Sequence, residues 1–246
     1  MPVPEKLKND AIVEALFEVR FTTSTLPEIL FGRISDYEPW KGFEQSVLPL
    51  AQIPLAMRQG DPNLRYQPVF ALVDREHKRA IRIGTSALVY SRGIPYIGWN
   101  VFKPELENVI SSLFKATNGI AIERMGLRYL NALRRDLHGI GSIADLNFRL
   151  AIAGEPVTAN ANVNITFDEL SDTACTVRIA TPDFIQGPLP PSTSVYVDVD
   201  VFTNQIEFST NDRKFVASWI ERAHTREKEH FFRLLTKSTL DVLVEK

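Results

Sequence analysis

Two arginines flank a glycine in the segment ERMGLRYLN, residues 123–131. If this segment is a strand, Arg124, Gly126 and Arg128 share one face, and the Cα atoms of the two arginines stand roughly 13 Å apart. Two guanidinium groups that converge over a glycine could hold a phosphate or a carboxylate through paired hydrogen bonds. The spacing therefore indicates a candidate site for an anionic ligand.

The same arginines have a structural interpretation, which we favour. Glu14 and Glu18 in the segment EALFEVRF are also four residues apart. If the two segments are neighbouring antiparallel strands, each arginine can form an ion pair with one of the glutamates. The first prediction is therefore an ion-paired strand face, and the anion site is the alternative.

Tyr129 and Asn131 belong to the same segment but point to the face opposite the arginines. The segment cannot act as one site if the strand is regular, so one of its faces has a structural role. We keep Tyr129 and Asn131 as binding candidates, although a partly buried amide such as that of Asn131 usually bonds to backbone or to a neighbouring helix.

Two further segments carry aromatic side chains that could contact a partner. Phe184 lies in the proline-rich loop TPDFIQGPLPPSTS, residues 181–194, which is either a docking loop or a connector that packs on the core. Trp99 lies in YIGWNVF, residues 96–102, which either rims a cavity or packs the start of a helix.

No metal or cofactor site is predicted. Asp198 and Asp200 form a D-x-D pair on a strand, but no further ligands follow at a diagnostic spacing. His224 and His230 are six residues apart on a helix, which differs from the four-residue spacing of a zinc-binding helix. An ion-paired or solvent-facing acidic strip is the better interpretation of the two aspartates.

Catalytic motifs are missing from the sequence, and we predict no catalytic residue. His138 lies in a loop without a serine or cysteine nucleophile in an elbow motif. Cys175 alternates with aliphatic residues, which is typical of a buried cysteine. No phosphate-binding glycine loop occurs. A hydrolase or transferase that uses Asp198, Asp200 and His138 is the weakest alternative.

Composition describes a globular protein of 246 residues with a net charge of -2. One cysteine excludes an internal disulfide, and the N-terminal residues contain no apolar segment of the kind that secretion signals need. No run approaches the roughly 20 apolar residues of a transmembrane helix. We therefore expect a cytoplasmic protein without a membrane partner, and no oligomeric state follows from the sequence.

Hydrophobic periodicity predicts the elements that must position these residues. The predicted strands are Glu14–Phe21, Gln45–Leu48, Val69–Asp74, Arg79–Gly84, Ala87–Ser91, Ile120–Arg134, Phe148–Ala153, Val157–Phe167, Ala174–Ala180 and Val195–Phe202. The predicted helices run from an N-cap at Thr25 to about Glu38, from about Lys103 to Thr117, and from about Asp212 onward with a break near Thr225.

This element order predicts an α+β fold with a mainly antiparallel, curved sheet, or two fused sheets, and with long helices packed on one face. We treat residues 1–246 as a single compact unit. Residues 11–119 and 120–246 both read as strand, short helix or loop, antiparallel strands and long helix, which suggests two pseudo-repeated halves. The path of residues 43–65 is irregular.

The segments EALFEVRF, YIGWNVFKPEL, ERMGLRYLN and EHFFRLL together resemble a sporadically distributed family of uncharacterised prokaryotic proteins. The resemblance runs from about Ala11 to the C-terminal helix, and R-x-G-x-R-Y-x-N is its most specific element. It implies no catalytic residues. Families of this kind are often accessory components of mobile or defence-related loci, which implies an interaction role.

We therefore expect a non-enzymatic binding or interaction protein that engages a protein partner or a small acidic ligand. A nucleic-acid-associated protein is the alternative from another class, and steep salt dependence of binding would be its signature. Its phosphate contacts would come from an arginine strip that consists of Arg124, Arg128, Arg134, Arg135 and Arg149.

Overall fold

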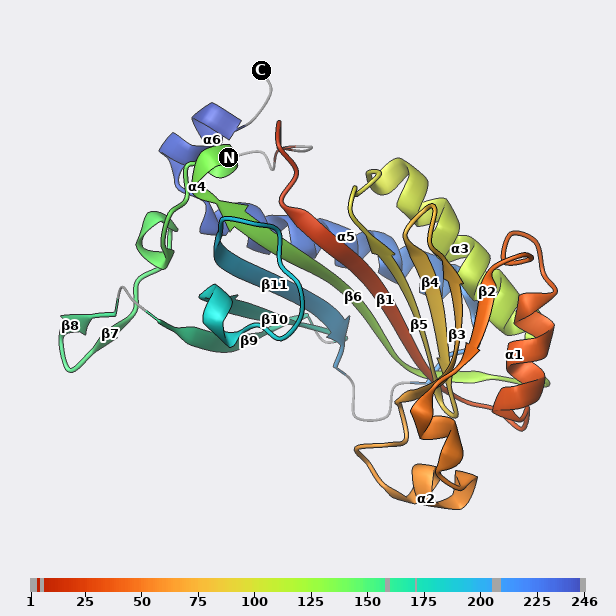
Figure 1. Cartoon of the computed structure of the whole chain (residues 1–246). Helices are drawn as coiled ribbons and strands as arrows, with labels where there is room; N and C mark the ends of the chain where they lie inside the picture. Colours follow the sequence, from red (N-terminus) through yellow and green to blue (C-terminus); the bar gives the residue numbers. More distant parts are fainter. Residues whose placement is uncertain (1–3, 5–6, 158–159, 171, 205–208, 244–246) are drawn as a thin grey trace. The chain divides into compact units, whose positions relative to one another are not determined.

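The computed structural model describes Pro4 and residues 7–157, 160–170, 172–204 and 209–243 (Figure 1). The strands are β1 (Ile12–Thr22), β2 (Glu44–Val47), β3 (Pro68–Asp74), β4 (Arg79–Gly84), β5 (Ala87–Gly93), β6 (Ala121–Arg134), β7 (Ala151–Ile152), β8 (Glu155–Pro156), β9 (Asn162–Leu170), β10 (Thr173–Ala180) and β11 (Thr193–Thr203). The helices are α1 (Pro27–Ser35), α2 (Leu55–Gly60), α3 (Trp99–Ala116), α4 (Arg135–His138), α5 (Arg213–Leu234) and α6 (Lys237–Leu243). Short 3-10 helices are η1 (Pro49–Gln52), η2 (Ile143–Asp145) and η3 (Pro182–Phe184).

Nine strands form one hydrogen-bonded sheet in the order β2-β3-β4-β5-β1-β6-β11-β10-β9. The pairs β2 with β3, β3 with β4, β4 with β5 and β9 with β10 are antiparallel. Strands β7 and β8 pair only with each other. The predicted α+β class with a mainly antiparallel sheet and packed helices is confirmed.

The chain divides into two compact units, each assembled from separate stretches of sequence. Unit 1 comprises Met1–Ala15, Leu127–Phe202 and Glu221–Lys246, and unit 2 comprises Leu16–Gly126 and Thr203–Ile220. Strands β1 and β6 and helix α5 contribute residues to both units. The duplication of residues 11–119 and 120–246 stays a prediction.

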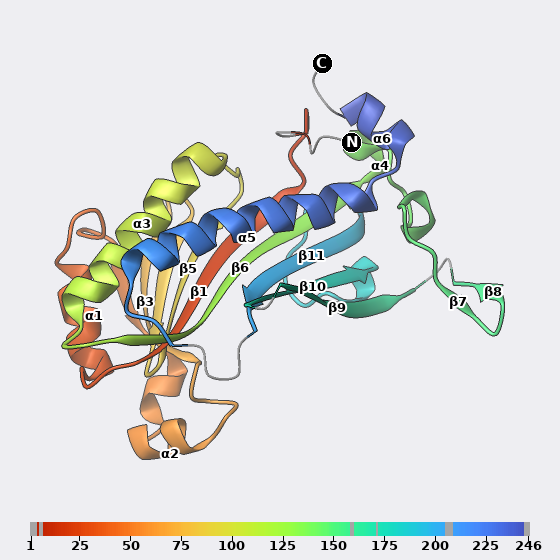
Figure 2. The same ribbon diagram turned by 180° about the vertical axis from the view of Figure 1, so that it is seen from behind.

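The core of unit 2 follows from alternation in its strands. Phe17, Val19 and Phe21 of β1 are fully buried, whereas the residues between them are partly exposed. Helix α3 covers the strand face on which Tyr90 lies, and its Phe102 ring stacks on the Tyr90 ring at 5.9 Å between centroids (Figure 2). Burial of each such side chain contributes about 1.5–3 kcal/mol.

In unit 1, one face of β11 and one side of α5 form the core. Four valines of β11 alternate on the buried face, and Ala223 and Phe231 of α5 are buried at helical spacing. Glu227 lies between them, four residues from each, and is only 4% exposed. A carboxyl group therefore takes a core position in this helix.

Several predicted boundaries in the first half were wrong. Helix α1 begins after Leu26, not after Thr25, because the Thr25 hydroxyl oxygen instead accepts a hydrogen bond from the backbone N–H of Asn118. Helix α1 also ends at Ser35, before the predicted Glu38. Helix α3 begins at Trp99, one turn before the predicted Lys103, because the chain already enters it at Gly98, where φ is positive.

Residues 43–65 contain more regular structure than expected. The edge strand β2 is confirmed, and the segment that follows forms η1 and α2 rather than an irregular loop. Arg58 of α2 is buried and donates hydrogen bonds to the Ile53 carbonyl and to the Thr85 hydroxyl. The bond to Thr85 joins residues 27 positions apart and is not visible in local sequence patterns.

The predicted break of the last helix near Thr225 was wrong, because the Thr225 hydroxyl donates to the Glu221 carbonyl within a continuous α5. The helix instead ends at Leu234, and α6 follows as a separate helix. Val216 of α5 is buried, and the preceding Phe215 is half-buried.

The predicted strands around residues 148–167 were also displaced. In place of the predicted strand Phe148–Ala153, the structure has the short strands Ala151–Ile152 and Glu155–Pro156, which pair with each other. In place of Val157–Phe167, strand β9 runs from Asn162 to Leu170. Residues 158–159 of the predicted strand Val157–Phe167 lie outside the described residues. Among the described residues, no helix is both long and apolar enough to cross a membrane.

Candidate functional site

Arg124 forms the ion pair that the structural interpretation predicted. Its guanidinium donates to a Glu18 carboxylate oxygen at 2.8 Å, and Arg20 donates to the same oxygen at 2.7 Å. The Arg20 guanidinium also lies over the Tyr66 ring, 4.3 Å from its centroid. Within unit 2, Arg124 is therefore one member of a side-chain network on β1 and β6.

Arg128 does not contact Glu14 and instead binds Asp198 of β11. The guanidinium donates two hydrogen bonds to the two carboxylate oxygens, at 2.8 and 2.5 Å. The pairing differs from the prediction because β6 lies between β1 and β11, so a strand that the local pattern could not place supplies the acid. The hydrogen bonds to Asp198 hold the pKa of Arg128 above its usual range.

Tyr129 and Asn131 are buried on the opposite face of β6 and pack within unit 1. The Tyr129 hydroxyl lies 3.4 Å from Nδ1 of His224, whose pKa burial lowers to about 4. The Asn131 amide donates to the carbonyls of Tyr129 and Val197, both at 3.3 Å. Both side chains therefore occupy structural positions without access to a ligand.

A group of polar side chains lies on the face of unit 1 that carries Arg128. Tyr196, Asp198 and Asp200 alternate on β11 with the buried valines, and Arg178 lies on the neighbouring β10. The Arg178 guanidinium is 5.8 Å from the centroid of the Tyr196 ring. We call Arg128, Arg178, Tyr196 and Asp198 the β10–β11 polar group.

Arg178 differs from Arg128 in its partners. It donates to the Asn162 side-chain oxygen at 2.9 Å and to the Phe184 carbonyl at 3.1 Å. Among the described residues, no carboxylate lies within ion-pair distance of Arg178. The hydrogen-bond partners of Arg178 among the described residues are therefore two neutral oxygen atoms.

Tyr196 places a hydroxyl among these charges. The residue is only 5% exposed, and its hydroxyl forms no hydrogen bond with a described residue. Burial and the Asp198 carboxylate raise the pKa of Tyr196 to about 12, although Arg128 and Arg178 act in the opposite direction. The hydroxyl is consequently protonated at neutral pH and is able to donate a hydrogen bond.

The proline-rich loop lies next to this group through Arg178. Its η3 helix ends at Phe184, the residue whose carbonyl accepts from Arg178, and the Phe184 side chain is 44% exposed. The Phe184 side chain is therefore not packed on the core, whereas Ile185 and Leu189 of the same loop are half-buried. The backbone of this exposed aromatic residue contacts a guanidinium that has no acid partner among the described residues.

Trp99 lies in the first turn of α3, in unit 2. Its ring is 6.3 Å from that of Phe102, and Tyr96 approaches Phe102 at 6.0 Å. This packing agrees with the second interpretation of the aromatic segment, in which it packs the start of a helix.

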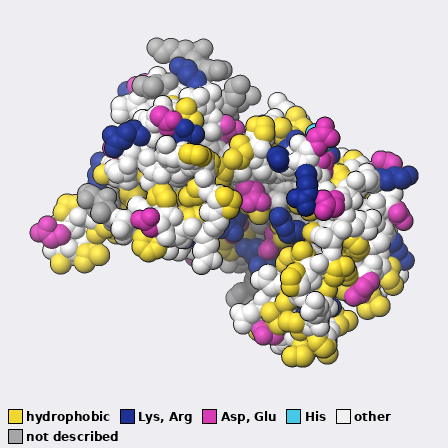
Figure 3. Space-filling model, in the orientation of Figure 1, with side chains coloured by type: hydrophobic (Ala, Val, Ile, Leu, Met, Phe, Trp, Pro, Cys, Tyr) yellow, Lys and Arg dark blue, Asp and Glu magenta, His cyan; other side chains and the backbone are white. Residues whose placement is uncertain are grey.

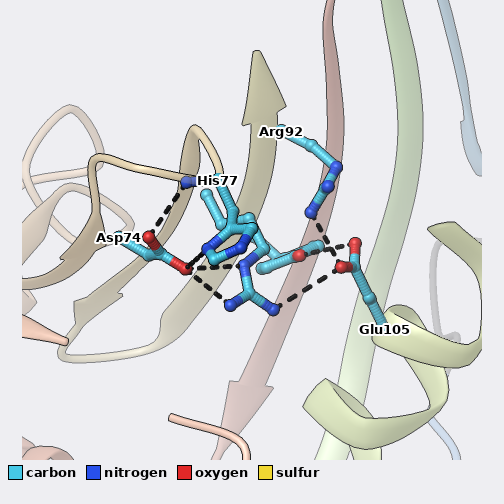
Figure 4. A network of polar contacts seen from close by, with 6 residues as sticks. Asp74, His77, Arg92 and Glu105 are labelled. Carbon is cyan, nitrogen blue, oxygen red and sulfur yellow. Dashed lines mark hydrogen bonds and ion pairs between the residues drawn. The ribbon is translucent and has the colours of Figure 1, made fainter. Parts of the chain in front are cut away.

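Local sequence patterns missed a buried charge network in unit 2 (Figure 4). Glu105 of α3 accepts hydrogen bonds from Arg92 at 2.8 Å and from the Tyr90 hydroxyl at 2.7 Å. The Arg79 guanidinium forms ion pairs with two carboxylates: its nitrogen atoms lie 3.6 Å from a Glu105 oxygen and 2.5 Å from an Asp74 oxygen. Only the Asp74 and Arg79 pair had a local signal, because the two residues close one hairpin and face each other across it.

Electrostatics in this network follow from burial and pairing. Burial would raise the pKa of Asp74, but hydrogen bonds from His77 and Arg79 lower it to about 2. Burial and the Glu105 carboxylate raise the pKa of Tyr90 above its usual range. Among the described residues, Nε of the buried Arg92 has no hydrogen-bond partner. The network is paired in charge and closely packed, which is typical of a structural role.

The residues of the weakest, enzymatic alternative do not assemble. His138 is buried, and its Nδ1 accepts a hydrogen bond from the backbone N–H of Arg134 at 2.9 Å. The imidazole therefore stabilises the turn in which it lies. Burial lowers its pKa. Asp198 is engaged by Arg128. The described part of the chain contains no group of three or more His, Cys, Asp or Glu side chains that could hold a metal ion. Cys175 is a fully buried free thiol.

The predicted arginine strip is largely neutralised. Arg124, Arg128 and Arg134 form ion pairs with Glu18, Asp198 and Asp136, respectively. On the face drawn in Figure 3, acidic side chains lie beside the basic ones rather than apart from them. These observations do not favour a surface that reads nucleic-acid phosphates.

Comparison of the sequence with models of protein families gives no match, and comparison with curated proteins gives none either. The resemblance of the ERMGLRYLN and EALFEVRF segments to an uncharacterised prokaryotic family stays a prediction.

Proposed function

We propose that the protein is a non-enzymatic, cytoplasmic binding protein that holds a small monocarboxylate at the β10–β11 polar group. The strongest support is Arg178, a guanidinium without a carboxylate partner among the described residues, beside a protonated tyrosine hydroxyl that forms no hydrogen bond. A carboxylate could accept from both donors.

Local charge favours a ligand with one negative charge. Asp198 already neutralises Arg128, and Asp200 and Glu14 are close enough to act electrostatically on Arg128 and Tyr196, respectively. A dianion such as phosphate carries a second negative charge, so these carboxylates would repel it more strongly than they repel a monocarboxylate. Phe184 is exposed and its backbone carbonyl accepts a hydrogen bond from Arg178, so its ring would be the nearest candidate for apolar contact with the rest of the ligand.

Titration calorimetry with benzoate and with inorganic phosphate tests the proposal. We expect saturable benzoate binding in the millimolar range or tighter, and weaker phosphate binding. Arg178→Ala should weaken benzoate binding by about tenfold or more, because a charge-assisted hydrogen bond contributes about 1.5–3 kcal/mol. Arg178→Lys should retain only part of the affinity, since lysine lacks the planar fork.

Arg75→Ala is the matched control, because Arg75 is an exposed arginine that pairs with Glu44 in unit 2. It should leave benzoate binding unchanged. Equal affinity of wild type and Arg178→Ala for benzoate, or phosphate binding as tight as benzoate binding, would contradict the proposal.

Tyr196→Phe separates a binding role of the hydroxyl from a structural role. Because the hydroxyl forms no hydrogen bond with a described residue, its removal should leave the midpoint of thermal unfolding nearly unchanged. Benzoate affinity should fall severalfold in the same variant. A large drop in thermal stability with unchanged affinity would assign the hydroxyl to the fold instead.

A further inference from the structure

The last strand of the sheet order leaves one edge without a partner. β9 pairs with β10 and, in the described part of the chain, with no second strand. Residues 162–168 are exposed except for the half-buried Val163, so no described element covers this edge. An uncovered edge presents unpaired backbone N–H and C=O groups that can bind another strand.

β9 lacks two common protections of an exposed edge, proline and lysine, although it carries Asp168 and Glu169 near its end. It is nine residues long, NVNITFDEL, and contains no proline and no lysine. Ile165 and Phe167 project from one face and are 39% and 41% exposed, and the Phe167 ring also contacts the His230 ring of α5 at 5.3 Å between centroids. Long, apolar and uncovered edges of this kind favour pairing between chains.

We propose that β9 pairs antiparallel with β9 of a second copy of this chain, with Thr166 on the twofold axis. In this register Ile165 lies opposite Phe167 of the partner subunit, and Phe167 lies opposite Ile165 of the partner subunit. The exposed apolar side chains of each copy therefore cover each other, which is the self-complementarity that a twofold interface requires.

Charge also favours this register. Asn164 lies opposite Asp168 of the partner subunit, so an amide meets a carboxylate. A register centred on Asp168 would instead place two aspartates opposite each other, which is unfavourable. Pairing through a single strand edge buries little surface, so we expect a dimer that dissociates on dilution.

Site-directed cross-linking tests the register. At the twofold axis the Thr166 side chains of the two copies would lie opposite each other. Thr166→Cys should therefore form a disulfide-linked dimer on mild oxidation. The native Cys175 is fully buried and should not react. Gln45→Cys on β2, the strand at the other end of the sheet order, is the control and should cross-link far less.

Sedimentation measurements test the dimer without a new cysteine. We expect the wild-type chain to approach twice the monomer mass as its concentration rises, and Ile165→Lys to remain a monomer with an unchanged circular dichroism spectrum. A wild-type chain that is monomeric throughout, or equal cross-linking of Thr166→Cys and Gln45→Cys, would overturn the proposal. Neither outcome depends on ligand binding at Arg178.

Discussion

Glu227→Gln should raise the free energy of unfolding by about 4 kcal/mol at pH 8 and by much less at pH 4.5. Glu227 is almost completely buried on α5, and burial raises its pKa to about 8, assisted by Asp10. Glutamine has a similar shape and no charge, so it removes the cost of ionising the side chain inside the core.

The direction of the pH dependence follows from the number of protons that the folded and unfolded states bind. Between about pH 4.5 and about pH 8 the folded protein keeps the Glu227 proton, whereas the unfolded chain loses it. The unfolded state therefore binds fewer protons, and the wild-type free energy of unfolding falls as the pH rises through this window. Glu227→Gln should lack this part of the pH dependence.

Urea unfolding at several pH values measures the difference between the two proteins. Glu107→Gln on α3 is the control, because the Glu107 side chain is 52% exposed and only 3.8 Å from Lys103. It should stay within about 0.5 kcal/mol of wild type. A constant offset between wild type and Glu227→Gln from pH 4.5 to pH 8 would show that Glu227 does not keep its proton in the folded state.

Glu105→Leu should lower the free energy of unfolding by about 3–5 kcal/mol. The change leaves the guanidinium of Arg92, whose side chain is 9% exposed, and the Tyr90 hydroxyl without their shared partner. An uncompensated buried charge costs more than the intact pair contributes. Urea unfolding at neutral pH measures the loss.

A double-mutant cycle makes this prediction specific. Arg92→Met in the Glu105→Leu background removes the unpaired charge and should recover part of the lost stability. Glu44→Gln, which removes an exposed ion pair with Arg75, should leave stability within error of wild type. If Glu105→Leu is as mild as Glu44→Gln, the network in Figure 4 does not stabilise unit 2.

Alternation in the sequence predicted most of the sheet. The pattern of β1 placed Phe17, Val19 and Phe21 in the core, and all three are fully buried. Tyr129 lies on the face of ERMGLRYLN opposite the arginines, as predicted, and Arg124 forms the predicted ion pair with Glu18. Local periodicity is sufficient for these results because one face of each strand is buried.

Strand order was not accessible from the same patterns. Arg128 binds Asp198 rather than Glu14, and Arg178 meets Tyr196, because β11 lies between β6 and β10. These neighbours are distant in the chain, so no spacing in the sequence links them. The acidic strip was predicted to be ion-paired or solvent-facing, and its Asp198 is ion-paired.

One missed feature did have a local signal. Ala223 and Phe231 are apolar residues at helical spacing within the predicted last helix, and Glu227 lies four residues from each. Helical periodicity therefore placed a carboxyl on the buried side. By contrast, the network of Glu105 joins one helix to two strands and depends on tertiary packing.

We propose that Arg178 is the charge that recognises a monocarboxylate. Side-chain nitrogen NMR of the arginines during a benzoate titration tests it most directly. We predict a saturable shift of the Arg178 Nε–H signal, with the Arg75 signal unchanged. No shift at Arg178, or equal and unsaturated shifts at Arg178 and Arg75, would contradict the claim.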